Sequence, residues 1–348
     1  MVKIVNPNLL TLIKVFLASV VLINHLDELA YSKELLVGYF PSSLLSINAF
    51  FILSGFLIMK SIEGDSSSLF LKRRTNKIFP SYLIVILLSA IFASVALSLS
   101  GKMDWPAVSS YLGWNSVFLN FMEPSIEGIF PNNTHREING ALWTIKIEVL
   151  YYLFFFLTYR LLSLLGGSPK QILISVCITF LAVNTGFEYA LEIMINRGLQ
   201  ENMAFYRQLP FQLPLFMLGI AIYFFQLSKA NIFESWFSFV VMVFITGFCL
   251  SKIEFLYETV IFCLIFIFIL NSNFDIPIKI PDVTYELYLV HCPLIQVGAA
   301  MGLFLLSDNT WLVLLTTYLV LVAFSLLLFK VSTRLMPFKT DNQRTAHK

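Results

Sequence analysis

Charged residues are scarce in this sequence. Asp, Glu, Lys and Arg make up 13% of its 348 residues, against roughly 25% in soluble domains, while 58% are hydrophobic and the mean hydropathy is +0.80. So little charge excludes an ordinary soluble globular domain. The net charge of +2 is also too small to favour nucleic-acid binding. The composition therefore indicates a polytopic membrane protein.

Cysteine is rare as well, and its spacing argues against two kinds of site. The cysteines all lie in apolar segments without C-x-x-C spacing: Cys177, Cys249, Cys263 and Cys292. This pattern favours packing residues, so we expect neither a disulfide framework nor a metal site. The first apolar stretch lacks a small-residue cleavage site before Asp27 and Glu28, so we expect a retained span.

Apolar segments long enough to cross a bilayer follow one another along nearly the whole chain. A window of about 20 residues predicts about ten transmembrane helices, and hence an all-α polytopic membrane protein. The predicted spans cover approximately residues 9–27, 39–59, 78–100, 142–163, 171–187, 209–228, 236–251, 255–271, 283–305 and 310–330. An even number of spans places both termini on one side of the membrane.

Lysine and arginine are distributed unequally between the two sides. If the N-terminus is cytoplasmic, the cytoplasmic segments hold fifteen of the 23 basic residues and the opposite side holds six. The remaining two, Lys14 and Lys146, lie within spans. The positive-inside rule therefore predicts that both termini are cytoplasmic. His25 would then lie near the outer face.

The first span carries two ionisable residues on nearly one face. Lys14 and His25 are eleven positions apart, which is about 1100° around a helix, or three turns plus about 20°, and about 16 Å along its axis. Ionisable groups at membrane depth usually point inward to a site. Alternatively, Lys14 extends to the headgroups and His25 caps the far end of the helix. This span alone leaves both interpretations open.

Two later spans also contain polar residues at membrane depth. In the fourth span, Glu148 lies between Trp143 and Tyr152, and a carboxylate there is costly unless it is paired. We therefore predict that Glu148 is functional. In the ninth span, Tyr288 and His291 are neighbours on the helix surface. A histidine beside a tyrosine is more often a satisfied structural pair.

Two connecting segments stand out. We expect residues 60–77 to form a cytoplasmic loop, which contains the run LKRRTNK with four positive charges. Such a run ordinarily sets topology, but Arg73 or Arg74 could instead bind a polyanionic cytosolic ligand with a forked guanidinium. The expected outer loop, 101–141, mixes aromatic and carboxylate side chains, which suit either a carbohydrate-facing surface or an interfacial belt.

Taken in order, these motifs resemble those of acyltransferase family 3, integral-membrane O-acyltransferases that use acyl-CoA and often acetylate cell-envelope glycans. The resemblance covers residues from about 10 to 335. Its motifs are a basic residue eleven positions before His25, FFILSGFLI at 50–58, the basic segment leading into Pro80 and Tyr82, the stretch 143–152, FMLG at 216–219 and the stretch 285–293.

The resemblance implies a role for each matching residue. His25 would be the catalytic histidine, and Glu148 the carboxylate of a Trp-x-x-x-x-Glu pattern that holds the imidazole in the required tautomer. Lys14 and Lys77 stand where the family usually has arginine, so they keep the charge and lose the bidentate fork. The donor-binding set would be Lys14, Arg73, Arg74 and Lys77. Substrate contacts are expected from Trp143, Tyr152, Tyr288 and His291.

The implied reaction moves an acyl group, expected to be acetyl, from cytosolic acyl-CoA to a hydroxyl of a cell-envelope or surface polysaccharide sugar. Direct transfer and an acyl-enzyme through Ser54 both remain open. We expect no permanently bound cofactor and no nucleic-acid partner. The expected partners are acyl-CoA, a glycan or lipid-linked sugar acceptor and membrane lipids, and the expected location is a bacterial inner membrane.

A proton-coupled secondary transporter is the alternative from another class, since buried His, Lys and Glu in ten helices also suit proton movement. Against it, the sequence has no evident internal repeat and lacks Gly/Pro-broken segments in matched halves. Under the transferase interpretation, residues 1–335 form the membrane domain and 336–348 a polar cytoplasmic tail. We expect no appended soluble esterase-like domain.

Overall fold

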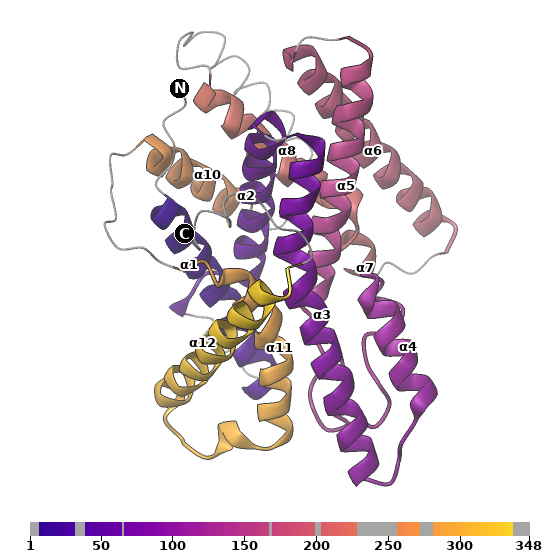
Figure 1. Cartoon of the computed structure of the whole chain (residues 1–348), viewed down its shortest axis with the longest axis vertical. Coiled ribbons are helices and arrows are strands. Elements are labelled where there is room, and N and C mark those ends of the chain that lie inside the picture. Colours follow the sequence, from indigo (N-terminus) through magenta and orange to yellow (C-terminus); the bar gives the residue numbers. More distant parts are fainter. Residues whose placement is uncertain are drawn as a thin grey trace. The chain divides into compact units, whose positions relative to one another are not determined.

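The computed structural model describes residues 7–31, 39–64, 66–166, 169–198, 203–227, 256–271 and 281–336 (Figure 1). Within these ranges the regular structure is helical and no β-strand occurs, which confirms the all-α class. Six of the helices are long and apolar enough to cross a membrane. The chain is therefore a multi-pass membrane protein. The predicted span at 236–251 lies outside the described residues.

The described chain divides into two compact units. Unit 1 contains the described residues of 47–64 and 144–271, and unit 2 contains those of 7–46, 66–143 and 281–336. The helices of unit 2 are α1 (Pro7–Leu26), the π-helical turn η1 (Asp27–Tyr31), α3 (Ser67–Leu99), α4 (Trp105–Ser116), α11 (Thr284–Ala300), the 3-10 turn η3 (Leu303–Leu305) and α12 (Thr310–Arg334). The helices that lie wholly or mainly in unit 1 are α2 (Ser43–Gly64), α5 (Leu142–Leu164), α6 (Pro169–Asn196), α7 (Met203–Tyr206), α8 (Leu209–Leu227) and α10 (Leu256–Asn271).

Unit 2 is organised around α11, which contacts α1, α3 and α12. Two side-chain contacts fix the relation of α1 to α11: Lys14 meets Asp282, just before α11, and His25 meets His291 within it. Because these pairs follow one another in the same order along both segments, α1 and α11 run side by side in the same direction. We call this line of polar contacts the α1–α11 seam.

We call residues 117–141 the outer segment, after the side of the membrane on which the sequence predicts them. Two strained aromatic residues anchor this segment to α3. Phe118 and Phe130 have positive φ angles of 64° and 55°, which bulky residues rarely adopt. The ring of Phe118 stacks on Tyr82, with 4.3 Å between centroids, and that of Phe130 stacks on Phe92 at 5.8 Å. Such strain persists only where the surroundings impose it. The outer segment is therefore a fixed part of unit 2.

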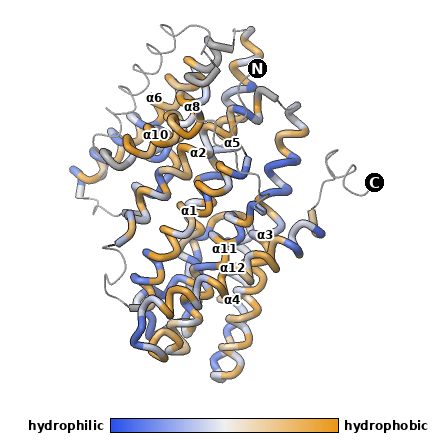
Figure 2. Tube along the Cα trace, turned by 90° about the vertical axis from the view of Figure 1, so that its left-hand side faces the viewer, coloured by the Kyte–Doolittle hydropathy of each residue, from blue (hydrophilic) through white to orange (hydrophobic). Residues whose placement is uncertain are grey.

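An exposed apolar stripe on α3 explains its place in a membrane. Leu83, Leu87, Ile91 and Val95 recur every four residues and are each at least 39% exposed. Figure 2 shows the same predominance of hydrophobic residues along the helices. A continuous apolar face of this length is stable against lipid chains and unfavourable in water.

The segment at 60–77 differs from the expected loop. The α2 helix continues to Gly64 and α3 begins at Ser67, so the basic run lies within the first turns of a 33-residue helix. Ser66 caps that helix, because its hydroxyl oxygen accepts a hydrogen bond from the Leu69 amide at 3.3 Å. The loop prediction was wrong because it took a change from apolar to basic residues as the end of a helix.

Unit 1 contains a close backbone approach between α2 and α8. A Cβ atom on Gly55 would collide with the backbone of Phe216, and one on Gly219 would collide with the Ile52 carbonyl and the Phe56 amide. Glycine at both positions lets the two helices touch directly. The motifs FFILSGFLI and FMLG, which are far apart in sequence, are therefore the two sides of one contact.

Replacing Gly219 with alanine should destabilise unit 1, because the added methyl group would push α2 away from α8. Overpacking of this kind costs roughly 1–3 kcal/mol. We expect detergent-purified Gly219→Ala to unfold several degrees below wild type. Gly186→Ala on α6 is the matched control, since a Cβ there meets nothing within 4 Å. Equal unfolding temperatures for the two variants would contradict the contact.

Candidate active site

Two histidines from distant parts of the sequence meet in unit 2. His25 Nδ1 lies 2.7 Å from His291 Nε2, and the two rings are nearly parallel, with 10° between their planes. His291 Nδ1 lies 2.7 Å from the backbone carbonyl oxygen of Tyr288. His291 is 1% exposed, whereas His25 is half-buried. His25 of the first predicted span and the neighbours Tyr288 and His291 of the ninth therefore form one hydrogen-bonded chain.

A proline in α11 removes one backbone hydrogen bond of the helix, and an asparagine side chain replaces it. Pro293 has no amide hydrogen, so it cannot satisfy the carbonyl of Leu289 four residues earlier. The side-chain amide of Asn139, in the outer segment, donates to that carbonyl at 2.9 Å. Asn139 is itself buried. The outer segment thus supplies a hydrogen bond that α11 lacks, two residues before His291.

An ion pair marks the other end of the seam. Lys14 Nζ lies 2.5 Å from Asp282 Oδ2, and the hydroxyl of Thr284 donates to the second carboxylate oxygen at 2.7 Å. Burial raises the pKa of Asp282, but the charges of Lys14 and Lys77 and the hydrogen bonds from Lys14 and Thr284 together outweigh burial, so the pKa is lowered overall. Two of the predicted donor-binding cations, Lys14 from α1 and Lys77 from α3, therefore act on one carboxylate.

The remaining basic residues of the donor set lie on the first turns of α3. Arg73 and Lys77 are exposed, and Arg74 is half-buried with its guanidinium carbon 5.6 Å from the centre of the Phe70 ring. Just beyond them, α3 is tied to α11, because the Tyr285 hydroxyl donates to the Ile78 carbonyl at 3.2 Å. The basic turns of α3 therefore lie near the start of α11.

Glu286 and Ser81 form a second link between these helices. The Ser81 hydroxyl donates to the Glu286 carboxylate at 2.7 Å, and both residues are buried. This neutral partner satisfies one lone pair of a carboxylate that lies inside the unit. This hydrogen bond holds α3 against α11 at a point one turn after Lys77 along α3.

Glu148 belongs to unit 1 and has its own partners there. Its carboxylate accepts hydrogen bonds from the hydroxyl of Tyr152, one turn along α5, and from Ser54 of α2 at 3.3 Å. Tyr152 is buried. The predicted contact of Glu148 with His25 would join the two units and stays a prediction. The same holds for substrate binding by Trp143, which is half-buried.

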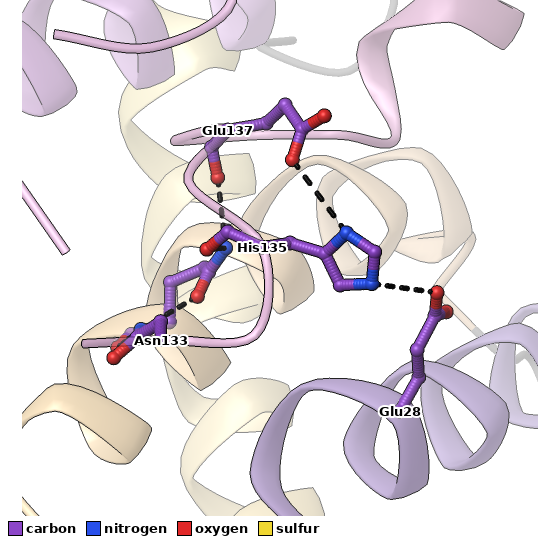
Figure 3. A network of polar contacts seen from close by, with 5 residues as sticks. Glu28, Asn133, His135 and Glu137 are labelled. Carbon is purple, nitrogen blue, oxygen red and sulfur yellow. Dashed lines mark hydrogen bonds and ion pairs between the residues drawn. The ribbon is translucent and has the colours of Figure 1, made fainter. Parts of the chain in front are cut away.

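Beyond the histidine pair, a cluster that we call the outer network ties the outer segment to η1, which follows α1 directly, and to α11 (Figure 3). The ring of His135 lies between two carboxylates, with Nε2 3.0 Å from Glu28 and Nδ1 3.9 Å from Glu137. Gln296 of α11, 1% exposed, donates to the backbone carbonyls of His135 and Glu137 and accepts from Asn133.

Sequence reasoning missed Asp282 and the contact between the histidines. The spacing of polar residues in the two segments could have indicated both contacts. His25 follows Lys14 by eleven residues, and His291 follows Asp282 by nine. Two helices with polar residues at similar spacing can pair them only if they run parallel and in register. Nothing in either span on its own specifies that register.

Comparison with known proteins adds independent information. The model of a family described as an acyltransferase domain matches residues 9–330. An O-acetyl transferase of Shigella phage Sf6 is 26% identical over 226 residues, or 63% of this chain and 61% of that protein. Acyltransferase MdmB of Streptomyces mycarofaciens is 29% identical over 127 residues, or 34% and 28%. The alignments thus span less than two thirds of either relative's length. No solved structure gives a significant match.

The Lys14–Asp282 pair should make stability depend on pH. Because the pKa of Asp282 is lowered by folding, its contribution is complete above the unfolded pKa of about 3.9 and is lost as pH falls through the lower folded value. The Asp282 side chain is 38% exposed, so we expect about 1 kcal/mol or less. Unfolding temperatures from pH 7 to 3 should separate wild type from Asp282→Asn at neutral pH and converge in acid. A constant difference across that range would contradict this account.

Proposed function

The chain belongs to the acyltransferase family, as its motifs predicted, and we propose that it is a membrane O-acyltransferase acting on a cell-envelope or surface polysaccharide. The observation that carries the proposal is the pairing of His25 with His291 on the same face of the seam as Lys14. An imidazole held by a second imidazole is suited to accept a proton at neutral pH. The printed name of the phage relative, O-acetyl transferase, supports acetyl as the acyl group and oxygen as the acceptor atom.

The donor is proposed to be cytosolic acyl-CoA. Its phosphates would be bound by Arg73, Arg74 and Lys77 on α3, with Lys14 next along the path. Lys14 and Lys77 both act on Asp282, so cationic groups from two helices converge near the start of α11. The thioester would then reach His25, about 16 Å farther along α1. A flexible pantetheine arm is suited to span such a distance.

The proposed reaction is a direct transfer with one base. A neutral His25 removes the proton of the acceptor hydroxyl while the oxygen attacks the thioester carbonyl carbon. A carbon–oxygen bond forms, the carbon–sulfur bond breaks, and the proton on His25 passes to the departing thiolate of CoA. The base ends the cycle neutral, and no group on the protein is consumed.

Three further residues belong to the proposal through their motif: Trp143 near the start of α5, and Glu148 and Tyr152 of unit 1. The carboxylate of Glu148 is held by two hydroxyl donors, Tyr152 and Ser54, and so has a fixed orientation. We assign Glu148 to electrostatic support of the reaction and Trp143 to contact with the sugar ring. Tyr152 acts by holding Glu148. The proposed location is the inner membrane of a bacterium.

Removing the proposed base should abolish transfer. We expect membranes containing wild type to incorporate label from radiolabelled acetyl-CoA into the glycan fraction. Membranes with His25→Ala at matched expression should incorporate roughly a hundredfold less label, or none. His135→Gln is the matched histidine control and should retain most of the activity. Equal labelling by wild type and His25→Ala would overturn the role of His25. Absence of label with wild type would count against this donor and acceptor and favour a proton-coupled transporter.

Replacing a donor-binding cation should weaken the binding of acetyl-CoA more than it lowers kcat. Lys77→Ala and Arg74→Ala should each raise the KM for acetyl-CoA roughly tenfold, since a charge-assisted hydrogen bond contributes about 1.5–3 kcal/mol. Lys72→Ala is the control, because Lys72 is an exposed cation of the same helix outside the proposed set. Equal KM values for all three variants would show that the run acts only through its overall charge.

A further inference from the structure

The hydrogen-bonded chain that ends on Tyr288 determines where the protons lie. A backbone carbonyl oxygen can only accept a hydrogen bond, so the contact of 2.7 Å requires a hydrogen on His291 Nδ1. A neutral imidazole carries a single ring N–H. His291 Nε2 therefore has a lone pair and can act only as an acceptor.

His291 must be neutral for this assignment to hold, and its surroundings favour that state. The residue is 1% exposed and lies in the middle of α11. Burying an unpaired imidazolium inside a membrane helix is costly. Its neighbours along α11 are a tyrosine and a cysteine, Tyr288 and Cys292, which bring no negative charge. A neutral His291 is thus the form that fits this position.

The same reasoning then fixes the protons of His25. Its Nδ1 lies 2.7 Å from a nitrogen that can only accept, so Nδ1 must carry the hydrogen. In neutral His25 the hydrogen is then absent from Nε2. The lone pair of His25 is on Nε2, the ring nitrogen that does not face His291.

We propose that His291 is a positioning residue that holds His25 in its Nδ1–H tautomer, so that Nε2 is the atom that accepts the proton of the acceptor hydroxyl. This inference rests on the proposed function of His25 as base. During transfer the hydroxyl proton moves to Nε2, and the Nδ1–H of the resulting imidazolium stays bonded to His291. The proton on Nε2 then passes to the CoA thiolate, which returns His25 to its starting tautomer.

The hydrogen-bonded chain from His25 through His291 to Tyr288 orients the base with neutral groups, whereas serine hydrolases use a carboxylate for this. There, a buried aspartate orients the imidazole and stabilises its charged form. Here the acceptor for His25 is an imidazole, polarised through its own hydrogen bond to the Tyr288 carbonyl. The role of setting the tautomer, expected from Glu148, is thereby assigned to His291. Glu148→Gln should then leave the tautomer of His25 unchanged.

The tautomer can be read directly by NMR of protein labelled with 15N in its histidines. The chain has only four histidines, so each ring can be assigned from a single His→Gln variant. We expect His25 in purified wild type to show a protonated Nδ1 and an unprotonated Nε2. In His291→Leu, which has no acceptor, the His25 signals should shift towards the Nε2–H form. In His291→Gln, the amide oxygen can replace the missing acceptor and should restore the Nδ1–H form.

Kinetics of the same variants give the second readout. His291→Leu should lower kcat roughly 10- to 100-fold while changing the KM for acetyl-CoA less than about threefold, because positioning acts on the base and not on donor binding. His291→Gln should recover a large part of kcat. A purely structural role for His291 would instead lower stability without changing the His25 tautomer.

Three results would overturn the inference: an Nε2–H tautomer of His25 in wild type, an unchanged tautomer and kcat in folded His291→Leu, or a tautomer change in Glu148→Gln. If His291→Leu does not fold, the wild-type spectrum and His291→Gln decide the question. The proposed function fails separately, when His25→Ala retains transfer. A wild-type Nδ1–H tautomer in protein without transferase activity would reject the function and leave the hydrogen-bonded chain intact.

Discussion

The parallel packing of α1 against α11 is the constraint on which the rest of unit 2 depends. It brings Lys14 to Asp282 at one end and His25 to His291 farther along, and the outer network follows beyond them. The two segments are separated by more than 260 residues in sequence, so no local preference could assemble them. Any shift of one helix turn along the seam would break every one of these contacts at once. Register between two helices is therefore the property that the site requires most.

The cost of polar groups in an apolar environment explains how the seam is stabilised. The ion pairs described along it lie at its two ends: Lys14 with Asp282 at one, and His135 with its carboxylates at the other. Between the ends the contacts need no net charge, since an imidazole meets an imidazole and a carbonyl. Glu286 is likewise met by a serine hydroxyl. The carboxylates at the two ends, Asp282, Glu28 and Glu137, are 38–55% exposed, and neutral partners occupy the middle.

The sequence predicted those features that depend on local composition, and it failed where tertiary register decides. Apolar runs predicted the helices, and the spacing of Lys14 and His25 correctly placed both residues on one face of α1, the face that packs against α11. The function of that face stays a prediction. The basic segment at 60–77 was misjudged, because a cap at Ser66 lets α3 begin before its apolar part. The contact of His291 with His25 was missed for a different reason. A histidine beside a tyrosine is ordinary in isolation, and it gains meaning only from a partner on another helix.

A neutral partner for the proposed base, His25, has a consequence for catalysis at membrane depth. A carboxylate beside His25 would stabilise the imidazolium more strongly, but it would itself need pairing whenever His25 is neutral. An imidazole partner avoids that cost in the resting state and still offers a lone pair when charge develops. The carboxylate of Glu148 accepts hydrogen bonds from two hydroxyl groups of its own unit, those of Tyr152 and Ser54. In our proposal, His291 orients the base and Glu148 supplies negative potential.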